Sequence, residues 1–333
     1  MHIALAAFTD NGRNVLEKLS TALLQEGHKI TIYQKEGRSW VKERWQDADV
    51  IVYISATGIA VRMIAPYVKD KFTDPAVVVV DEHGKYCISL LSGHVGGGNE
   101  WTLHFCKILS ATPIITTATD INNKFAVDVF AKKNNLSIES PLLAKEVSAR
   151  ILKGEKIPIY SEKPIEGELD NSLFLSDSSP FGIYIGVYKK SPFKETLYLV
   201  PKVLSVGVGC KRDTQLNLIQ ELMDSVFNNH QLQFSAINSL CSIDLKANET
   251  GLIAYCKEHS LPFNTYSSEI LLQAEGEFTP SPFVKKITGV DNVCERSAVV
   301  NSNGGEKLVN KTVKQGVTVA VAMKNWSVTT CLK

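Results

Sequence analysis

The sequence lacks the cysteine spacing of a disulfide framework or a zinc site. Its seven cysteines are scattered along 333 residues and include no CxxC pair. An odd, dispersed set in a chain of this length is more typical of reduced thiols buried as small hydrophobic side chains.

Net charge is nearly absent too, because 36 basic residues face 35 acidic ones and leave +1. Without a basic stripe, nothing in the charge favours a nucleic-acid partner. The longest apolar runs, such as 76–80 and 317–323, are under half of the ~20 residues that span a bilayer. We therefore expect a soluble, cytoplasmic protein that binds neither nucleic acid nor membrane.

Nucleotide-binding fingerprints are missing as well. The stretch GHVGGGNE at 93–100 lacks GxGxxG spacing, and nothing in the sequence matches GxxxxGK[ST]. The first strand-to-helix turn, TDNGRN at 9–14, lacks the glycines that a dinucleotide pyrophosphate needs. NAD and ATP are therefore poor candidates, and a nucleotide-dependent enzyme ranks third, below the two functions described at the end of this section.

What is present indicates an α/β protein, and at roughly 100–200 residues per domain the length favours two domains and permits three. In residues 1–120, apolar strand signals alternate with helices, which predicts a mainly parallel, Rossmann-like sheet. Residues 121–200 contain a long polar connection flanked by short strands, which indicates a small α+β middle module. Residues 201–333 resume the α/β pattern.

The densest cluster of chemistry-bearing residues is LLSGHVGGGNEW at 90–101, where a strand leads into a helix. Glycine amides and a helix N-terminus suit a phosphate or carboxylate, and His94 and Glu100 could act as an acid/base pair beside it. The alternative is a tight turn with a hydrogen-bonded His94. The residues expected to bind a ligand here are Ser92, Gly96, Gly97, Gly98 and Asn99.

Four other places are candidate binding elements. Thr57 and Gly58 begin a helix that carries Arg62 one turn later, where it could hold a carboxylate, although a plain capped helix explains them equally well. Thr117 and Asp120 follow a strand, and open α/β sheets bind ligands at the carboxyl ends of strands.

The other two places lie in the last third. Gly209 and Cys210 belong to a glycine turn before a helix, and Cys210 has no identifiable histidine partner for nucleophilic catalysis. Glu249 and Glu295 are further binding candidates, although charged clusters of this kind more often cap helices or pair on surfaces.

Several motifs in fixed order resemble one known family. They are ATGIAVRMIAP (56–66), DKFTDPAVVVVDEHG (70–84), LLSGHVGGGNE (90–100), PIITTATD (113–120), VGVGCKRDT (206–214), SIDLKANETGL (242–252) and VCERSAV (293–299). Together they are similar to the cobalamin-biosynthesis family CbiG, the cobalt-precorrin-5A hydrolases, and the last third also resembles the related protein CobE. One departure is Asp213, where the family commonly has glycine.

The resemblance implies a hydrolase that opens a δ-lactone on a cobalt-containing tetrapyrrole and releases acetaldehyde in anaerobic cobalamin biosynthesis. On this interpretation His94 is the general base, Glu100 orients it or relays a proton, and the glycine amides hold a carboxylate or the oxyanion. Cobalt would travel with the substrate, so no enzyme-bound cofactor or metal is expected.

The alternative implied by the same resemblance is a non-catalytic carrier that hands a tetrapyrrole to a pathway methyltransferase. Tight binding without acetaldehyde release would distinguish this carrier from the hydrolase. Neighbouring methyltransferases are expected partners, and a homodimer stays open as the assembly.

Overall fold

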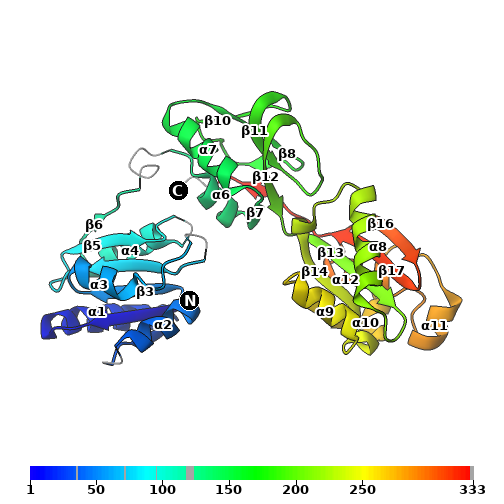
Figure 1. The fold of residues 1–333 in the computed structure, drawn as a ribbon, viewed down its shortest axis with the longest axis horizontal. Helices are drawn as coiled ribbons and strands as arrows, with labels where there is room; N and C mark the ends of the chain where they lie inside the picture. The colour runs from blue at the N-terminus through cyan, green and yellow to red at the C-terminus, as the bar shows by residue number, and fades with distance from the viewer. Residues whose placement is uncertain (35–36, 71–72, 95, 118–123, 331–333) are drawn as a thin grey trace. The chain divides into compact units, whose positions relative to one another are not determined.

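The computed structural model describes residues 1–34, 37–70, 73–94, 96–117 and 124–330. The chain forms two compact units, Met1–Val129 and Phe130–Lys333, which Figure 1 shows as ribbons. The first unit contains β1 (His2–Ala7), α1 (Asp10–Gln25), β2 (Lys29–Ile32), α2 (Arg38–Asp47), β3 (Val50–Ile54), α3 (Thr57–Ile64), β4 (Ala76–Val80), β5 (Tyr86–Leu91), α4 (Gly98–Leu109) and β6 (Thr112–Ile114).

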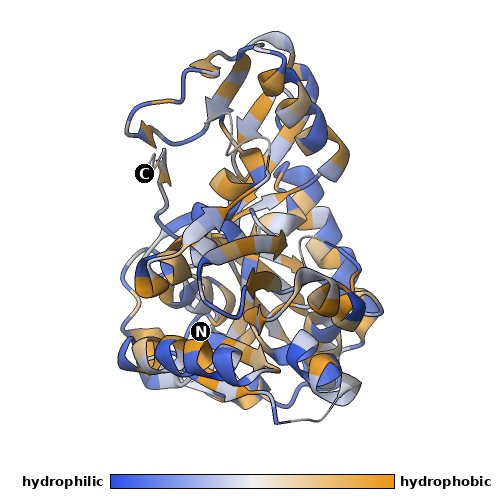
Figure 2. Cartoon of the chain, turned by 90° about the vertical axis from the view of Figure 1, so that its left-hand side faces the viewer, coloured by the Kyte–Doolittle hydropathy of each residue, from blue (hydrophilic) through white to orange (hydrophobic). Residues whose placement is uncertain are grey.

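The sheet of the first unit has the strand order β2-β1-β3-β4-β5-β6. Helices cover both faces, because side chains of α1 and α4 pack with one set of alternating strand residues and those of α2 and α3 with the other. Burial on both faces explains the continuous apolar runs of β3 and β4, which are buried throughout. In Figure 2 the helices carry both orange and blue residues, as amphipathic helices should.

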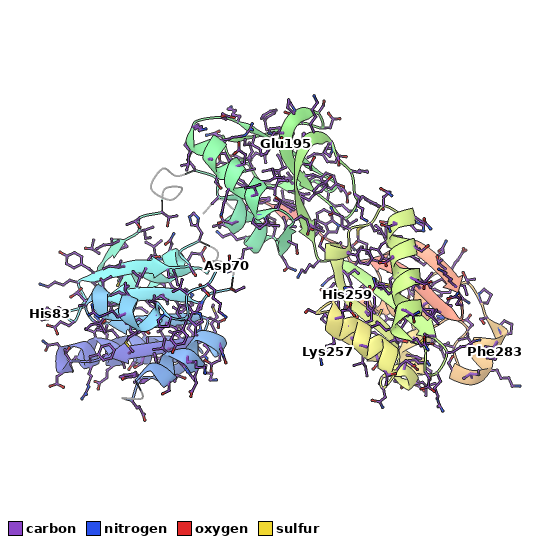
Figure 3. The ribbon with its side chains drawn as sticks, in the orientation of Figure 1. Asp70, His83, Glu195, Lys257, His259 and Phe283 are labelled. Atoms are coloured by element: carbon purple, nitrogen blue, oxygen red, sulfur yellow. The ribbon has the colours of Figure 1, made fainter. Side chains whose placement is uncertain are left out.

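One hairpin sets the position of the candidate loop. Strands β1 to β4 are parallel, but β5 runs antiparallel to β4 after the turn that contains His83. Strand β5 therefore ends at the edge where β3 and β4 begin, close to the loop that contains Asp70. Figure 3 shows His83 and Asp70 at opposite ends of this unit.

Helix α6 (Val127–Lys133) spans the boundary between the units. The second unit then contains two larger sheets. Its remaining elements are β7 (Leu136–Ile138), α7 (Pro141–Leu152), β8 (Ile157–Ser161), β9 (Ile165–Glu166), β10 (Leu173–Leu175), β11 (Ser179–Ile185), β12 (Phe193–Pro201), β13 (Leu204–Cys210), α8 (Leu216–Asn229), β14 (Ile237–Ile243), α9 (Thr250–Glu258), β15 (Phe263–Tyr266), α10 (Ser268–Leu272), α11 (Pro282–Thr288), α12 (Cys294–Asn301), β16 (Glu306–Lys314), β17 (Val317–Met323) and β18 (Val328–Thr329).

The two sheets have the orders β10-β8-β11-β12-β7 and β15-β14-β13-β17-β16. Helices α8 and α9 share the large core of the second sheet, whereas α12 packs on β13, β14 and β17. This approach is close, because a Cβ at Gly207 would lie 1.8 Å from the carbonyl oxygen of Cys294.

Residues 328–329 pair with a strand from the first part of the second unit, far from them in the sequence. Strand β18 pairs with β9, and the Asn134 side chain accepts from the amide of Thr329 and donates to its carbonyl, at 2.8 and 3.0 Å. Residues 328–329 thus bind the 130–201 segment, although we expected the whole of 201–333 in one C-terminal domain. The boundaries at 120 and 200 stay predictions.

The α/β class predicted from the sequence is confirmed, with a mostly parallel first sheet. The apolar runs at 76–80 and 317–323 form the strands β4 and β17. Ser140 caps α7 by accepting from the amide of Leu143, and Pro141 follows as the first helical residue.

Candidate functional site

The glycine-rich loop is a tight turn between β5 and α4. The amides of Gly97, Gly98 and Asn99 donate to backbone carbonyls of the same turn, at 2.9–3.1 Å. We expected the amides of Gly96, Gly97 and Gly98 to face a ligand, and two of these, Gly97 and Gly98, donate inside the turn instead. Their hydrogen bonds inside the turn leave the predicted cradle without those donors.

The turn also explains why glycine is required here. A Cβ at Gly96 would lie 2.4 Å from the Cβ of Ser92, and one at Gly98 would lie 3.0 Å from the carbonyl oxygen of Leu91. Gly97, the residue before α4, has φ +81°, in the left-handed region that favours glycine. The tight-turn interpretation therefore accounts for the glycines themselves.

Polar side chains still gather at this turn. The Asn99 Nδ2 donates to the hydroxyl of Thr117, three residues beyond β6, at 3.1 Å, so the structure brings this separately predicted residue to the turn. Ser92 has φ +53°, and its buried Oγ has no hydrogen-bond partner among the described residues. Asp120, the other residue predicted at this edge, lies outside the described residues.

His94 lies against a carboxylate that the sequence analysis missed. Its Nδ1 is 3.8 Å from Oδ1 of Asp128, in the first turn of α6, and the two side chains are only 13% and 11% exposed. No local motif links residues so distant in the chain. Glu100, expected to orient His94, lies in the first turn of α4 and is exposed.

Thr57, Gly58 and Arg62 lie at the opposite edge of the sheet. They follow β3, whose end pairs with the end of β4 beside the hairpin turn, whereas the glycine-rich turn follows β5 at the other edge. A five-residue strand separates the edges by about 15 Å. The exposed Arg62 guanidinium folds back over Gly58, within 3.5 Å of a Cβ placed there. The structure therefore does not bring these three residues to His94.

In the second unit, Gly209 and Cys210 end β13. A Cβ at Gly209 would lie 2.6 Å from the Thr318 hydroxyl, so glycine lets β17 approach. Burial raises the pKa of the Cys210 thiol, which keeps it protonated and argues against a thiolate nucleophile. Asp213 has φ +59°, in the left-handed region that favours glycine, which explains why the family commonly has glycine at this position.

Glu249 is buried and held by the fold. Its carboxylate accepts from the amide of Thr214 at 3.1 Å and from Lys246 Nζ at 2.7 Å. Burial opposes ionisation, but the Lys246 ion pair and the backbone donors outweigh it and hold the pKa of Glu249 below its usual range. Because protein donors stabilise the buried carboxylate, no bound ligand is needed to account for the burial of Glu249.

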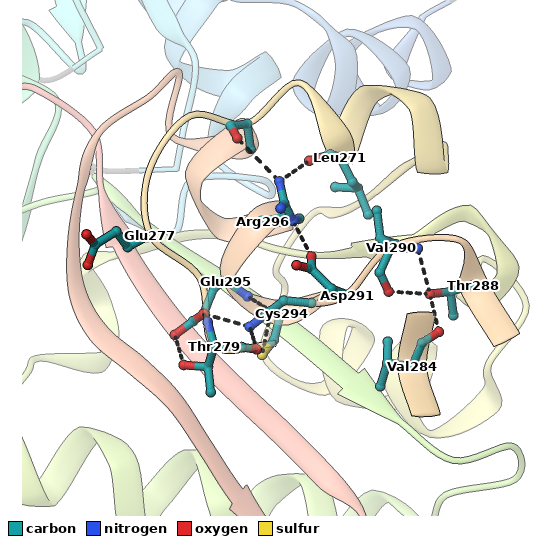
Figure 4. Close-up of polar contacts among 12 residues, drawn as sticks. Leu271, Glu277, Thr279, Val284, Thr288, Val290, Asp291, Cys294, Glu295 and Arg296 are labelled. Carbon is teal, nitrogen blue, oxygen red and sulfur yellow. Dashed lines mark hydrogen bonds and ion pairs between the residues drawn. The ribbon is translucent and has the colours of Figure 1, made fainter. Parts of the chain in front are cut away.

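Glu295 is fully buried and even more extensively bonded (Figure 4). Its oxygens accept from the amides of Thr279 and Lys311, at 2.7 and 2.8 Å, and from Asn292 Nδ2 at 2.6 Å; Lys307 Nζ lies 3.6 Å away. Burial opposes ionisation, but these donors hold its pKa below the usual range. Glu295, which we predicted to bind a ligand, instead connects α12 with the loop at Thr279 and with β16.

The described residues hold neither a metal-ligand cluster nor a membrane-spanning helix. They contain no cluster of three or more His, Cys, Asp or Glu side chains arranged to hold a metal ion. Their helices include none that is both long and apolar enough to cross a membrane.

Comparison with known proteins identifies a cobalamin-synthesis protein. Three family models match consecutive parts of the chain: cobalamin synthesis G N-terminal (39–120), cobalamin biosynthesis central region (125–201) and cobalamin synthesis G C-terminus (204–322). The crystal structure of CobE, a protein from the cobalamin biosynthetic pathway, aligns with 38% of this chain and 94% of its own at 24% identity and a TM-score of 0.36.

Two curated relatives narrow the identification. The cobalt-precorrin-5A hydrolase of Salmonella typhimurium is 35% identical over 82% of this chain and 81% of its own. That of Priestia megaterium is 30% identical over 90% of this chain and 85% of its own. The chain therefore belongs to the CbiG family, that of the cobalt-precorrin-5A hydrolases, as the sequence motifs indicated.

Proposed function

We propose that this protein hydrolyses cobalt-precorrin-5A, opening its δ-lactone and releasing acetaldehyde to give cobalt-precorrin-5B. The observation that carries the proposal is 30–35% identity to two hydrolases of that name over most of this chain. Three consecutive parts of the chain also match the N-terminal, central and C-terminal models of the family.

The reaction needs one base that also returns a proton. Water loses a proton to the base and adds to the lactone carbonyl, the ester C–O bond breaks, and the departing alkoxide is protonated. Removal of that hydroxyl proton then lets the adjacent C–C bond break, so that acetaldehyde leaves and the electron pair enters the conjugated macrocycle. Water is consumed, and neither oxidant nor reductant is required.

We assign the base to His94. A histidine changes charge near neutral pH, so it can take and return a proton in consecutive steps. Its position at the end of β5, with Asn99 and Thr117 in the same turn region, supports the assignment. A positioned base contributes about 10²–10⁴-fold to such a reaction.

The remaining predicted residues divide into groups. Ser92, Asn99 and Thr117 surround the turn and suit hydrogen bonding to the substrate's polar edge, whereas Thr57, Gly58 and Arg62 form a separate place for an anion at the other sheet edge. Glu249 and Glu295 have structural roles in this proposal, because protein donors occupy their carboxylates.

The proposed enzyme uses no cofactor of its own, because cobalt enters as part of the substrate. A cytoplasmic location completes the proposal, and cell fractionation tests it.

The direct test is acetaldehyde formed per mole of cobalt-precorrin-5A consumed by the purified protein. The proposal expects one acetaldehyde per substrate and a product lighter by the loss of acetaldehyde and heavier by one water. Tight binding of an active substrate preparation without any acetaldehyde would instead identify a carrier.

A further inference from the structure

The contact between His94 and Asp128 joins two distant parts of the first unit. His94 belongs to the turn after β5, and Asp128 lies in the first turn of α6. Their side chains are nearly nine-tenths buried, and Nδ1 and Oδ1 lie 3.8 Å apart, within ion-pair reach. The proposed mechanism assigns no role to Asp128.

A carboxylate facing one ring nitrogen determines what the other nitrogen can do. It favours the tautomer with hydrogen on Nδ1, which puts the lone pair on Nε2, and it stabilises the imidazolium formed when Nε2 takes a proton. Asp128 is itself oriented, because Oδ1 accepts from the amide of Val129 at 3.0 Å. Both properties suit a base that must take up and return a proton.

We propose that Asp128 is the positioning residue of His94: its carboxylate orients the ring and favours the tautomer that leaves Nε2 free to take a proton. The inference rests on the proposed function, in which His94 is the base. It assigns the orienting role to Asp128, whose carboxylate lies 3.8 Å from the His94 ring, and not to Glu100, which is exposed.

The test variant is Asp128→Asn, because asparagine keeps an oxygen for the Val129 amide and removes only the charge. Asp10→Asn is the matched control, since Asp10 also lies in the first turn of a helix but its side chain is 98% exposed. Glu100→Gln is measured alongside, because Glu100 is the nearest acidic residue to His94 along the chain. Asp128→Glu tests rescue by a longer carboxylate.

For Asp128→Asn we expect kcat to fall by about 10–100-fold with little change in KM. Nitrogen NMR of the His94 ring without substrate should show less of the tautomer with hydrogen on Nδ1 than in the wild type. The control and Glu100→Gln should leave that tautomer ratio unchanged, and Asp128→Glu should restore part of kcat.

An unchanged tautomer ratio of His94 in Asp128→Asn would overturn the inference, as would a higher KM and lower Tm with an unchanged kcat, which indicate a purely structural residue. A wild-type protein that releases no acetaldehyde would contradict the proposed function instead. Because the NMR measurement needs no turnover, it distinguishes the two failures.

Discussion

Replacing Glu295 by glutamine should destabilise the second unit without touching the proposed chemistry. Glutamine keeps the size of the side chain but puts an NH2 group where one oxygen accepts. One oxygen accepts from the amide of Lys311, and the other accepts from the amide of Thr279 and from Asn292 Nδ2. At least one buried donor therefore loses its acceptor and faces another donor.

The magnitude follows from those bonds. A hydrogen bond to a charged group contributes about 1.5–3 kcal/mol, and a buried unsatisfied donor costs about 1–3 kcal/mol. We expect Glu295→Gln to lower the free energy of unfolding by about 2–4 kcal/mol, measured by urea denaturation at pH 7. For a unit of this size that corresponds to a Tm lower by about 4–16 °C. Glu277→Gln, which changes an exposed carboxylate in the loop that contains Thr279, should change neither the free energy of unfolding nor the Tm.

The pH dependence has a defined sign. The folded state lowers the pKa of Glu295, so its contribution is complete above the unfolded pKa of about 4.3 and is lost as pH falls through the folded pKa. The difference between wild type and Glu295→Gln should therefore shrink in acid. Unchanged stability together with lost substrate binding would refute this reasoning and restore the ligand role predicted from the sequence.

Three further substitutions test the packing of the second unit. Gly207→Ala should destabilise by more than about 3 kcal/mol or prevent folding, because its Cβ would meet the Cys294 carbonyl at 1.8 Å; a normal urea midpoint would contradict the α12 packing. Asn301→Ala should cost about 2–4 kcal/mol by the same assay, because this side chain bonds four polar side chains beneath α12. Asp213→Gly should change stability by less than about 1 kcal/mol, since the backbone there is left-handed, and a larger loss would show that the aspartate side chain matters.

Sequence patterns predicted the central strands of the first unit well, because β3 and β4 are buried on both faces and therefore appear as continuous apolar runs. The same reasoning missed β14, whose sequence INSLCSI is broken by serines. Those serines are buried and hydrogen-bonded: the Ser239 hydroxyl accepts from Asn301, and the Ser242 hydroxyl donates to the Val208 carbonyl. A strand that satisfies its polar residues through distant partners carries no local signal.

The candidate site was predictable only in part. The turn between β5 and α4 follows from strand and helix boundaries, but its hydrogen bond to Thr117 was not predicted from the sequence. The hairpin at β4–β5 separates Arg62 from His94, a consequence of strand direction that motif spacing does not express. Asp128 reaches His94 through tertiary structure alone, so nothing near His94 in the sequence indicates it.

Acetaldehyde release by His94→Ala, compared with wild type at matched substrate occupancy, tests the central claim most directly. The account predicts at least about 100-fold slower release by the variant, with cobalt-precorrin-5A still bound, because a positioned base contributes that much. Release at the wild-type rate by a variant that binds normally would contradict the assignment of the chemistry to His94.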